Sequence, residues 1–188
     1  MQPITVTIEG TTPLIVNKFS DEAQFAATSG NSTNHKASRA PREEAESRLY
    51  TDAQGKPVMP QPNIFRCIID AGKFFKLGKS KVTTFKTSLI PACLSVEGIL
   101  FPIESEQGWS VDQRPIRNPS TGGRFLRFRP IFHDWRITFP LALDEEIMSL
   151  QFLREILDAA GKRIGLGDFR PDCKGPFGKF TVTHWNKG

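Results

Sequence analysis

The chain has 188 residues and a mass of 21.1 kDa, which fits one domain and excludes an enzyme built from two catalytic domains around a cleft. Its composition, 38% hydrophobic and 24% charged, is near the globular average and predicts a folded core. The net charge of +5 favours a polyanionic partner. That excess is local, because residues 61–130 hold 11 basic and 5 acidic side chains.

Cysteine and histidine usage argues against disulfide and metal chemistry. The three cysteines are widely spaced and odd in number, which leaves neither a disulfide framework nor a Cys-x-x-Cys metal knuckle. The three histidines lack ligand spacing, so we expect no metal and no cofactor. The start of the chain does not resemble a signal peptide, and no run approaches the roughly 20 apolar residues of a membrane helix. We expect a soluble cytoplasmic protein, from a prokaryotic cell or a phage-infected host, with no membrane partner.

The N-terminal third predicts one strand followed by a long insertion. Apolar and polar residues alternate over 4–8, which indicates a strand with one buried face, and residues 13–16 extend or re-enter the same edge. Residues 19–54 form a predicted flexible insertion, with a short helix at 41–50 that opens on a proline. The insertion has few apolar residues that could anchor it to a core.

The rest of the chain predicts two helices and the remaining strands of a sheet. The first predicted helix covers 63–75, with Asn63 as its N-cap, and the second covers 144–160 and ends at Gly161. Between them we expect strand–turn–strand over 82–98, where Thr83, Phe85, Thr87 and Leu89 alternate, then a strand at 99–103, a protruding basic hairpin at 109–133 and a strand at 135–139. A glycine-rich loop over 161–179 and a strand at 180–185 follow the second helix. Without insertions the order is βαββαβ, which is typical of the ferredoxin-like or RRM-type α+β fold. We expect a single RRM-like domain over 1–188, with an antiparallel sheet and two helices on one face.

Arginine and phenylalanine are concentrated in the predicted hairpin. Strand alternation places guanidinium and aromatic groups on both of its faces. Arginine binds phosphates and aromatic rings stack on unpaired bases, which favours sequence-independent binding of single-stranded nucleic acid. The alternative is a solvated edge hairpin whose arginines only prevent aggregation. The residues concerned are Arg114, Arg117, Arg124, Phe125, Arg127, Phe128 and Arg129.

Two further basic segments lie outside the hairpin. The first is a run of lysines around the end of the first predicted helix: Lys73, Lys76, Lys79, Lys81 and Lys86. Contact with phosphates and attraction of the positive charges to the negative end of the helix dipole explain this run equally well. The second is the glycine-rich loop, whose glycines either bring backbone N–H groups close to a ligand or serve the geometry of the connection alone. The loop matches neither the P-loop nor the dinucleotide-binding glycine pattern, which argues against a nucleotide cofactor.

Catalysis has weak support in the sequence. His35 lies in the polar insertion, where it could act as a general base on a 2′-hydroxyl in a metal-independent ribonuclease, and a solvated loop histidine is the plainer interpretation. Asp21 is a loop carboxylate of the kind that a metal-assisted nuclease uses, but no partner carboxylate recurs at a fixed spacing. We therefore assign no catalytic residue and keep both side chains as candidates.

Three stretches of the chain, taken in order, form a recognisable series. Ile4–Lys18 is a strand followed by a Pro-Leu turn into a variable loop, and Gly55–Arg66 has Gly-x-Pro and an apolar pair before a helix with a basic residue. Gly161–Phe180 is a late glycine-rich loop before the closing strand. The series resembles the RAMP superfamily of CRISPR-associated guide-RNA-binding proteins. With one ferredoxin-like unit and a basic hairpin, the chain is most similar to the backbone subunits that polymerise along a guide RNA.

The resemblance implies that the chain binds single-stranded guide-like RNA, or DNA, together with copies of itself and other CRISPR-complex subunits. In such subunits the loop after the first helix and the glycine-rich loop contact the RNA backbone, and a hairpin thumb bends between nucleotides and contacts the neighbouring subunit. Outside the hairpin, the expected contacts are Lys18, Lys56, Asn63, Arg66, Lys73, Lys162, Arg163, Arg170 and Lys174.

The chain also departs from the family pattern. Gln61-Pro62-Asn63 stands where the family has Gly-Ser-Ser, and the proline removes a backbone donor. The chain is short for a backbone subunit, so a solitary, phage-borne relative is an equal alternative. A phage protein that uses this fold for protein contacts or for single-stranded DNA is a further alternative.

Overall fold

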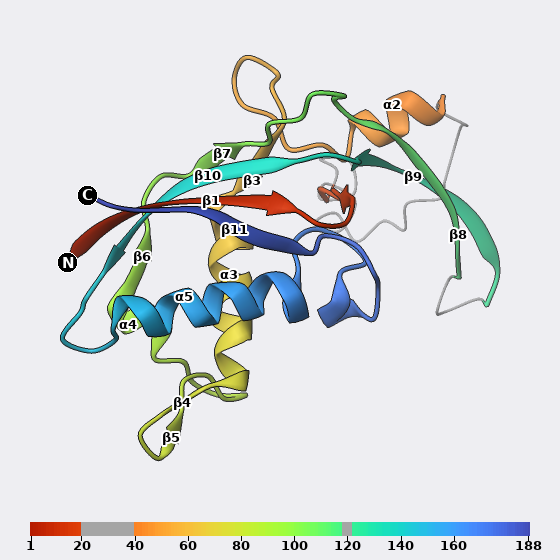
Figure 1. Cartoon of the computed structure of the whole chain (residues 1–188). Coiled ribbons are helices and arrows are strands. Elements are labelled where there is room, and N and C mark those ends of the chain that lie inside the picture. Colours follow the sequence, from red (N-terminus) through yellow and green to blue (C-terminus); the bar gives the residue numbers. More distant parts are fainter. Residues whose placement is uncertain (20–39, 118–121) are drawn as a thin grey trace, which may run out of the picture.

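The main sheet of the protein is antiparallel and has four strands. The computed structural model describes residues 1–19, 40–117 and 122–188. The elements of the main layer are β1 (Gln2–Gly10), α3 (Gln61–Ala71), β6 (Leu94–Val96), β10 (Arg136–Leu143), α5 (Leu150–Ala159) and β11 (Phe180–Lys187). The strand order in space is β11-β1-β10-β6 (Figure 1). This is the predicted βαββαβ arrangement, so the ferredoxin-like α+β class is confirmed.

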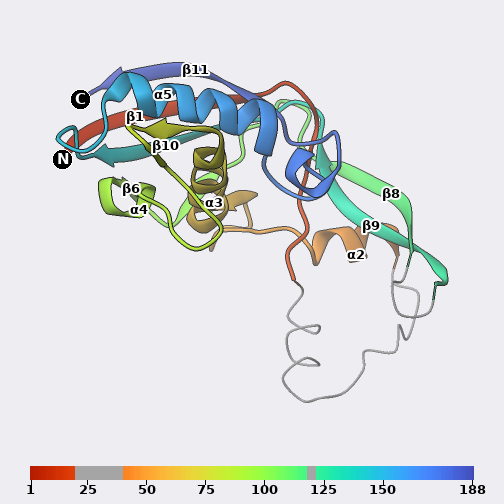
Figure 2. The ribbon, with the colours of Figure 1, turned by 90° about the horizontal axis from the view of Figure 1, so that it is seen from below.

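The core lies between this sheet and the two helices. Ile4, Val6 and Ile8 of β1 are buried, and each pairs with a buried residue of β10. The helices α3 and α5 cover the same face of the sheet, which Figure 2 shows from the helix side. Burying one large aliphatic side chain contributes roughly 1.5–3 kcal/mol. The buried residues of β1 therefore help to hold both helices in position on the sheet, and this positions the segments that follow each helix.

Both helices begin away from their predicted N-termini. α3 starts at Gln61, so Asn63 lies inside the helix and the prediction that it caps the helix is wrong. α5 starts after Ser149, whose hydroxyl accepts a hydrogen bond from the Phe152 N–H over 3.3 Å. Residues 144–148 form turns instead of helix. Among the described residues, no helix has the length and apolarity that a membrane crossing requires.

The chain leaves α5 through a π-helix, Ala160–Ile164, and does not stop at Gly161 as predicted. The turn is closed by a hydrogen bond of 2.8 Å from the Gly165 N–H to the Ala160 carbonyl. A Cβ at Gly161 would stand 2.0 Å from the carbonyl oxygen of Phe180. This position needs glycine because β11 passes directly against it, not because the helix ends there.

A second antiparallel sheet has the order β2-β9-β8 and extends away from the main sheet (Figure 1). Residues 13–16 do not continue the main sheet edge as predicted, because Leu14 pairs with Phe132 of β9. The strands β8 and β9 form the hairpin, and the short helix α2 packs against β9. The bounds are β2 (Leu14–Ile15), α2 (Pro41–Glu46), β8 (Ser110–Arg117) and β9 (Arg124–Phe132).

Short elements fill the middle of the chain. The predicted strand over residues 82–89 is wrong, because Thr84 and Thr87 form a tight turn, with a hydrogen bond of 2.8 Å from the Thr84 N–H to the Thr87 carbonyl. Ahead of that turn, β4 and β5 form a two-residue ribbon. The bounds are β3 (Val58–Pro60), η1 (Gly72–Phe74), β4 (Lys76–Leu77), β5 (Ser80–Lys81), α4 (Ile90–Cys93), β7 (Leu100–Pro102) and η3 (Pro171–Cys173).

Candidate nucleic-acid interface

A cavity of about 260 Å³ opens where the end of β2, the N-terminal half of α3 and the glycine-rich loop meet. We call it the α3 cavity. It brings together three of the residues that the sequence predicted to be contacts: Asn63, Arg66 and Arg170. The remaining lining residues are Val16, Asn17, Tyr50, Met59, Cys67, Gly165, Leu166, Gly167 and Asp168.

The glycine-rich loop forms one wall of the α3 cavity because it packs tightly on β2. The Asp168 N–H donates to the Ile15 carbonyl over 2.7 Å. Gly167 has a φ of +73°, and a Cβ there would stand 2.3 Å from that same carbonyl oxygen. Gly178 makes a similar close approach to the Leu166 carbonyl. These glycines serve backbone packing, which supports the geometric interpretation of the loop.

Cys67 of α3, which lines the cavity, connects this helix to the same loop. Its thiol donates to the Gly165 carbonyl, with 3.3 Å between Sγ and oxygen. The side chain is buried, and desolvation raises the pKa of the Cys67 thiol well above its ordinary value. The thiol is therefore a packing group and not a reactive one.

Basic side chains at the mouth of the cavity are partly compensated. Arg66 is 72% exposed and its Nε lies 2.9 Å from Asp70, whose hydrogen bond raises the pKa of Arg66. The guanidinium of Arg170 donates to the Gly167 carbonyl over 3.1 Å and lies 3.7 Å from Asp172. An arginine has five N–H groups, so these partners do not use all the donors of either residue.

The C-terminal end of α3 meets the glycine-rich loop through Lys73. Its Nζ lies 2.7 Å from Asp172, and that hydrogen bond lowers the pKa of the Asp172 carboxyl. The ring of Phe74 lies under two cations, with Lys73 Nζ at 5.3 Å and Arg163 Cζ at 4.8 Å from its centroid. An exposed aromatic ring and four basic groups thus form one continuous surface with the cavity mouth.

Arg129 does not present its charge to solvent. It is 4% exposed, and its guanidinium donates to Asp112 of β8 and to Asp168 of the glycine-rich loop, each over 2.8 Å. The expectation that Arg129 is a surface contact is therefore corrected. The residue joins the base of the hairpin to the cavity wall, and buried pairs of this kind fix relative positions.

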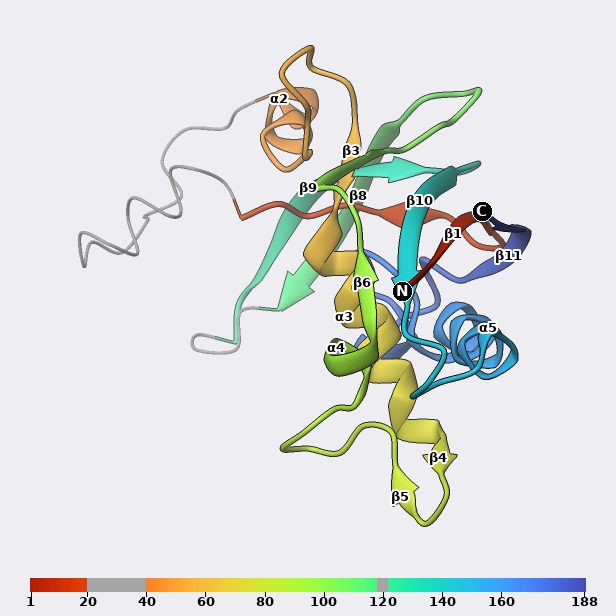
Figure 3. The ribbon, with the colours of Figure 1, turned by 90° about the vertical axis from the view of Figure 1, so that its left-hand side faces the viewer.

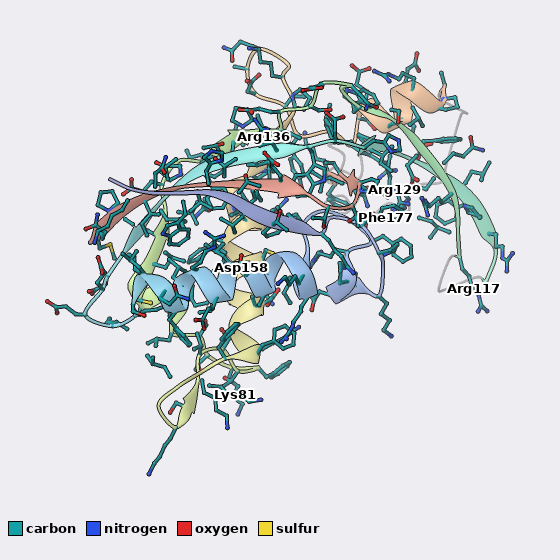
Figure 4. The ribbon with its side chains drawn as sticks, in the orientation of Figure 1. Lys81, Arg117, Arg129, Arg136, Asp158 and Phe177 are labelled. Atoms are coloured by element: carbon teal, nitrogen blue, oxygen red, sulfur yellow. The ribbon has the colours of Figure 1, made fainter. Side chains whose placement is uncertain are left out.

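A second link of the same kind runs through Arg114. Its Nε lies 2.6 Å from Asp112, and its Cζ lies 4.5 Å from the ring centroid of Phe177 in the glycine-rich loop. Figure 4 shows Arg129 and Phe177 close together at the hairpin base, with Arg117 at its far end. The predicted hairpin and the predicted loop are thus one surface.

The outer half of the hairpin carries the exposed cations. Arg117 and Arg124 are exposed and directly opposite each other in the register. Arg127 is half-buried, and its Nε is buried with no hydrogen-bond partner. Burial, together with the nearby Arg48 and Arg129, lowers the pKa of Arg127. The rings of Phe125 and Phe128 are half-buried, so their edges are accessible.

The other predicted contacts lie around this surface, not in the cavity. Lys162 and Lys174 are exposed on the glycine-rich loop, and Lys174 adopts a left-handed conformation with φ of +61°. Lys56 is exposed on the turn before β3 and does not line the α3 cavity. Lys18 is half-buried, and its N–H donates to the Arg48 carbonyl over 2.8 Å.

The sequence did not reveal two residues of this site, Asp168 and Tyr50. Asp168 accepts from both Asn17 and Arg129, and so holds the loop, β2 and the hairpin together. Tyr50 lines the cavity and is its one aromatic wall. The only available signal for Asp168 was a carboxylate directly after the Gly-x-Gly of a basic loop, which does not identify its partners.

The two candidate catalytic residues, His35 and Asp21, lie outside the described residues. Residues 1–19, 40–117 and 122–188 contain no group of three or more His, Cys, Asp or Glu side chains placed to hold a metal ion.

Comparison with known proteins relates the chain to others through its fold. No protein-family model matches the sequence. No curated protein matches it either. Among solved structures, one chain of "Cryo-EM structure of the Type III-B Cmr-beta bound to cognate target RNA" aligns over 99% of this chain, with a TM-score of 0.61 and 10% identity. At that identity the likeness concerns the fold.

The chain spans 60% of the length of that first neighbour. A chain of "Type IV-B CRISPR Complex" aligns over 96% of this chain and 90% of its own length, with a TM-score of 0.48 and 12% identity. The protein thus shares its ferredoxin-like fold with a chain of the Type III-B Cmr-beta structure.

Proposed function

We propose that the protein binds single-stranded nucleic acid, with RNA as the main ligand, independently of sequence and as a backbone-type subunit of a CRISPR-like ribonucleoprotein. One observation carries the proposal: basic side chains of α3 and the glycine-rich loop converge at the mouth of the α3 cavity, and the base of the arginine-rich hairpin is joined to the same loop. Arg129 and Arg114 make this convergence rigid, because each connects the hairpin to another segment of the surface.

The chemistry of the surface suits an unpaired strand. Arg66 and Arg170 offer guanidinium donors at the cavity mouth, where phosphates would lie. Tyr50 in the cavity and Phe125 and Phe128 on the hairpin offer rings for stacking on bases. Cations that track the backbone and rings that stack on any base are the usual means of binding without sequence reading.

The fold supports RNA over DNA. The neighbour with a TM-score of 0.61 belongs to an assembly whose description states that it is bound to cognate target RNA. By the same analogy, we propose that copies of this chain and other subunits of such an assembly are its protein partners. The exposed outer half of the hairpin, with Arg117 and Arg124, is the part that extends farthest toward a neighbouring molecule (Figure 4).

Salt-dependent binding tests the proposal. Fluorescence anisotropy with a labelled oligouridine of about 16 nucleotides measures affinity between low and moderate salt. Each lost phosphate contact lowers the salt slope by about 0.7, so Arg66→Gln with Arg170→Gln lowers it by about 1.4. Arg136→Gln is the matched control, because Arg136 is an exposed arginine that pairs with Glu9 and lies outside the α3 cavity. Binding without salt dependence, or an unchanged slope in the double variant, contradicts the proposal.

A deoxyribose version of the same strand distinguishes the two nucleic acids. We expect weaker binding of the deoxyribose strand. Equal affinity would leave the surface as a general single-strand binder and contradict the preference for RNA.

A further inference from the structure

A ribbon of lysines projects from the C-terminal end of α3. We call residues 76–86 the lysine ribbon; it contains β4, β5 and the turn at Thr84. The sequence from Ala71 to Val96 contains five lysines and no aspartate or glutamate. Figure 3 shows β4 and β5 protruding at one end of the molecule, beyond α3. The basic charge of this segment is therefore not balanced within it.

The lysine ribbon is an ordered structure and not a loose loop. Lys76 pairs with Lys81 across the ribbon, and the Val82 N–H donates to the Phe75 carbonyl over 3.1 Å. Val82 and Thr83 are buried and anchor the base of the turn. The Thr84 hydroxyl then accepts the Thr87 N–H over 3.0 Å, which holds the tip.

The tip presents an aromatic ring entirely to solvent. Phe85 is fully exposed, with a relative accessibility of 104%, and Lys86 follows it. A large apolar side chain gains nothing from such a position in an isolated fold, because its burial would contribute roughly 1.5–3 kcal/mol. A rigid turn that displays it favours a function in contact with another molecule.

The helix end does not explain these lysines. The field of a helix terminus falls off within the last turn. The helical chain continues through η1 and ends at Phe74, so Lys76 lies two residues beyond that end, whereas Lys79, Lys81 and Lys86 lie five or more residues beyond it. Among the residues that the structure describes, no carboxylate lies within ion-pair distance of the four ribbon lysines, in contrast to Lys73 and its Asp172 partner. Those four are Lys76, Lys79, Lys81 and Lys86.

The ribbon is connected to the α3 cavity by a basic path. Asn63 near the start of α3 lines the cavity, and the ribbon follows its end. The 11 residues of the helix span about 16 Å. Lys73, Phe74 and Arg163 lie between the two, with the ring covered by both cations. The carboxylates beside this path, Asp70 and Asp172, are each paired with a basic side chain, Arg66 and Lys73 respectively.

We propose that the lysine ribbon binds a further stretch of the same single-stranded nucleic acid. Lys76, Lys79, Lys81 and Lys86 contact its phosphates, and Phe85 stacks on an unpaired base. The inference rests on the proposed function and extends it, because it assigns a second binding segment beyond the α3 cavity. It also gives the ligand a minimum length, since a strand confined to the cavity cannot reach the ribbon.

A second copy of the chain is the competing occupant. The opposite end of the molecule has a cavity of about 490 Å³ whose lining includes four carboxylates, Glu9, Glu104, Glu106 and Asp134. Figure 4 places Arg136, which lines that cavity, and Lys81 at opposite ends. We favour nucleic acid because the ribbon continues a basic surface, whereas two of the four carboxylates are already engaged: Glu9 pairs with Arg136, and Asp134 accepts from the Glu106 N–H.

Strand length tests the proposal. Anisotropy titrations use two labelled oligouridines. The short one, of about 2 nucleotides, is shorter than α3 and stays at the cavity, whereas the long one, of about 16 nucleotides, reaches the ribbon. The triple variant Lys79→Glu, Lys81→Glu, Lys86→Glu should weaken long-strand binding at least about tenfold and lower its salt slope by about 2, with short-strand binding unchanged. Phe85→Ala should weaken the long strand only, and Phe85→Trp should retain it.

The outcomes separate the proposal from its alternatives. Equal long-strand affinity of the native chain and the triple variant overturns the proposal, as does an equal loss for both strands. If the native chain binds neither strand, the proposed function itself fails.

Sedimentation velocity measures self-association in the same variants. A variant that loses self-association while it keeps full long-strand affinity assigns the ribbon to a second copy and overturns the proposal. Lys187→Glu, an exposed lysine on β11 that pairs with Glu145, is the matched charge control.

Discussion

Arg129 of the hairpin donates to Asp168 of the glycine-rich loop over 2.8 Å, and this ion pair joins two segments that are 39 residues apart in the chain. The same guanidinium reaches Asp112 on the other strand of the hairpin, and both Arg129 and Asp112 are buried. The relationship decides how the candidate interface is organised. The hairpin is not an independent arm but one side of a surface whose other side is the loop.

Arg129→Met should destabilise the protein by roughly 3 kcal/mol, because the buried Asp112 carboxylate then keeps only the half-buried Arg114 as an ion-pair partner. Urea unfolding followed by circular dichroism measures the loss. Adding Asp112→Asn to the variant should recover part of it, since the buried charge is removed. Arg117→Met at the exposed end of the hairpin is the control and should stay within about 0.5 kcal/mol of the native chain. Similar stabilities for the two single variants would contradict this account of Arg129.

Gly167→Ala should cost several-fold more stability than Gly78→Ala. Both glycines have positive φ, +73° and +60°, so each substitution carries a backbone penalty of about 1 kcal/mol. Only at Gly167 does the new Cβ meet backbone, 2.3 Å from the Ile15 carbonyl oxygen, whereas Gly78 has open space. Thermal unfolding of the two variants compares them directly. An equal shift of both midpoints would show that the loop is not packed on β2 as described.

The ion pair of Lys73 and Asp172 should make a small, pH-dependent contribution to stability. The hydrogen bond from Lys73 lowers the pKa of Asp172 in the folded protein. The contribution is therefore present above the unfolded pKa of about 3.9 and lost as the pH falls through the lower folded value. Lys73→Met should cost about 0.2–1 kcal/mol at pH 7, and the difference should vanish once the pH is below the lowered folded pKa of Asp172. A difference that persists in acid would assign the effect to packing.

Cysteine alkylation should separate the three thiols. Cys173 is exposed, whereas Cys67 and Cys93 are buried, and burial raises the pKa of both buried thiols. Iodoacetamide should therefore modify Cys173 first in the folded protein, as intact-mass spectrometry followed by peptide mapping would detect. Because Cys173 lies between Asp172 and Lys174 on the proposed interface, bound oligouridine should slow its modification. Unchanged modification in the presence of a saturating strand would argue against contact at this loop.

Much of the fold could be predicted from local patterns. Alternation over residues 4–8 identified β1 because one face of that strand is buried and the other is not. The same rule failed over 82–89, where Thr83 is buried and Phe85 is fully exposed. Threonine hydroxyls closed a turn there, and side-chain to backbone hydrogen bonds of that kind compete with strand formation.

The candidate site was only partly predictable. The resemblance to the RAMP superfamily pointed to Arg66 and Arg170, and the local excess of basic residues pointed to the hairpin. The sequence did not reveal that Arg129 is buried. Alternation along a strand shows on which face a side chain lies, but not whether another segment covers that face. The covering group, Asp168, comes from a distant loop, and only the tertiary packing brings it to Arg129.

The π-helix at the end of α5 determines the direction in which the backbone enters the glycine-rich loop. That turn accommodates one residue more than an α-helical turn, because its hydrogen bond spans five residues, from Gly165 back to Ala160. A chain shortened by one residue there would continue as ordinary helix, and the next residue would point about 100° away around the axis. The backbone at Asp168 would then miss the Ile15 carbonyl, and the wall of the α3 cavity would not form. Deleting a single residue in this turn is therefore the change that most directly removes the cavity, although it reverses no charge.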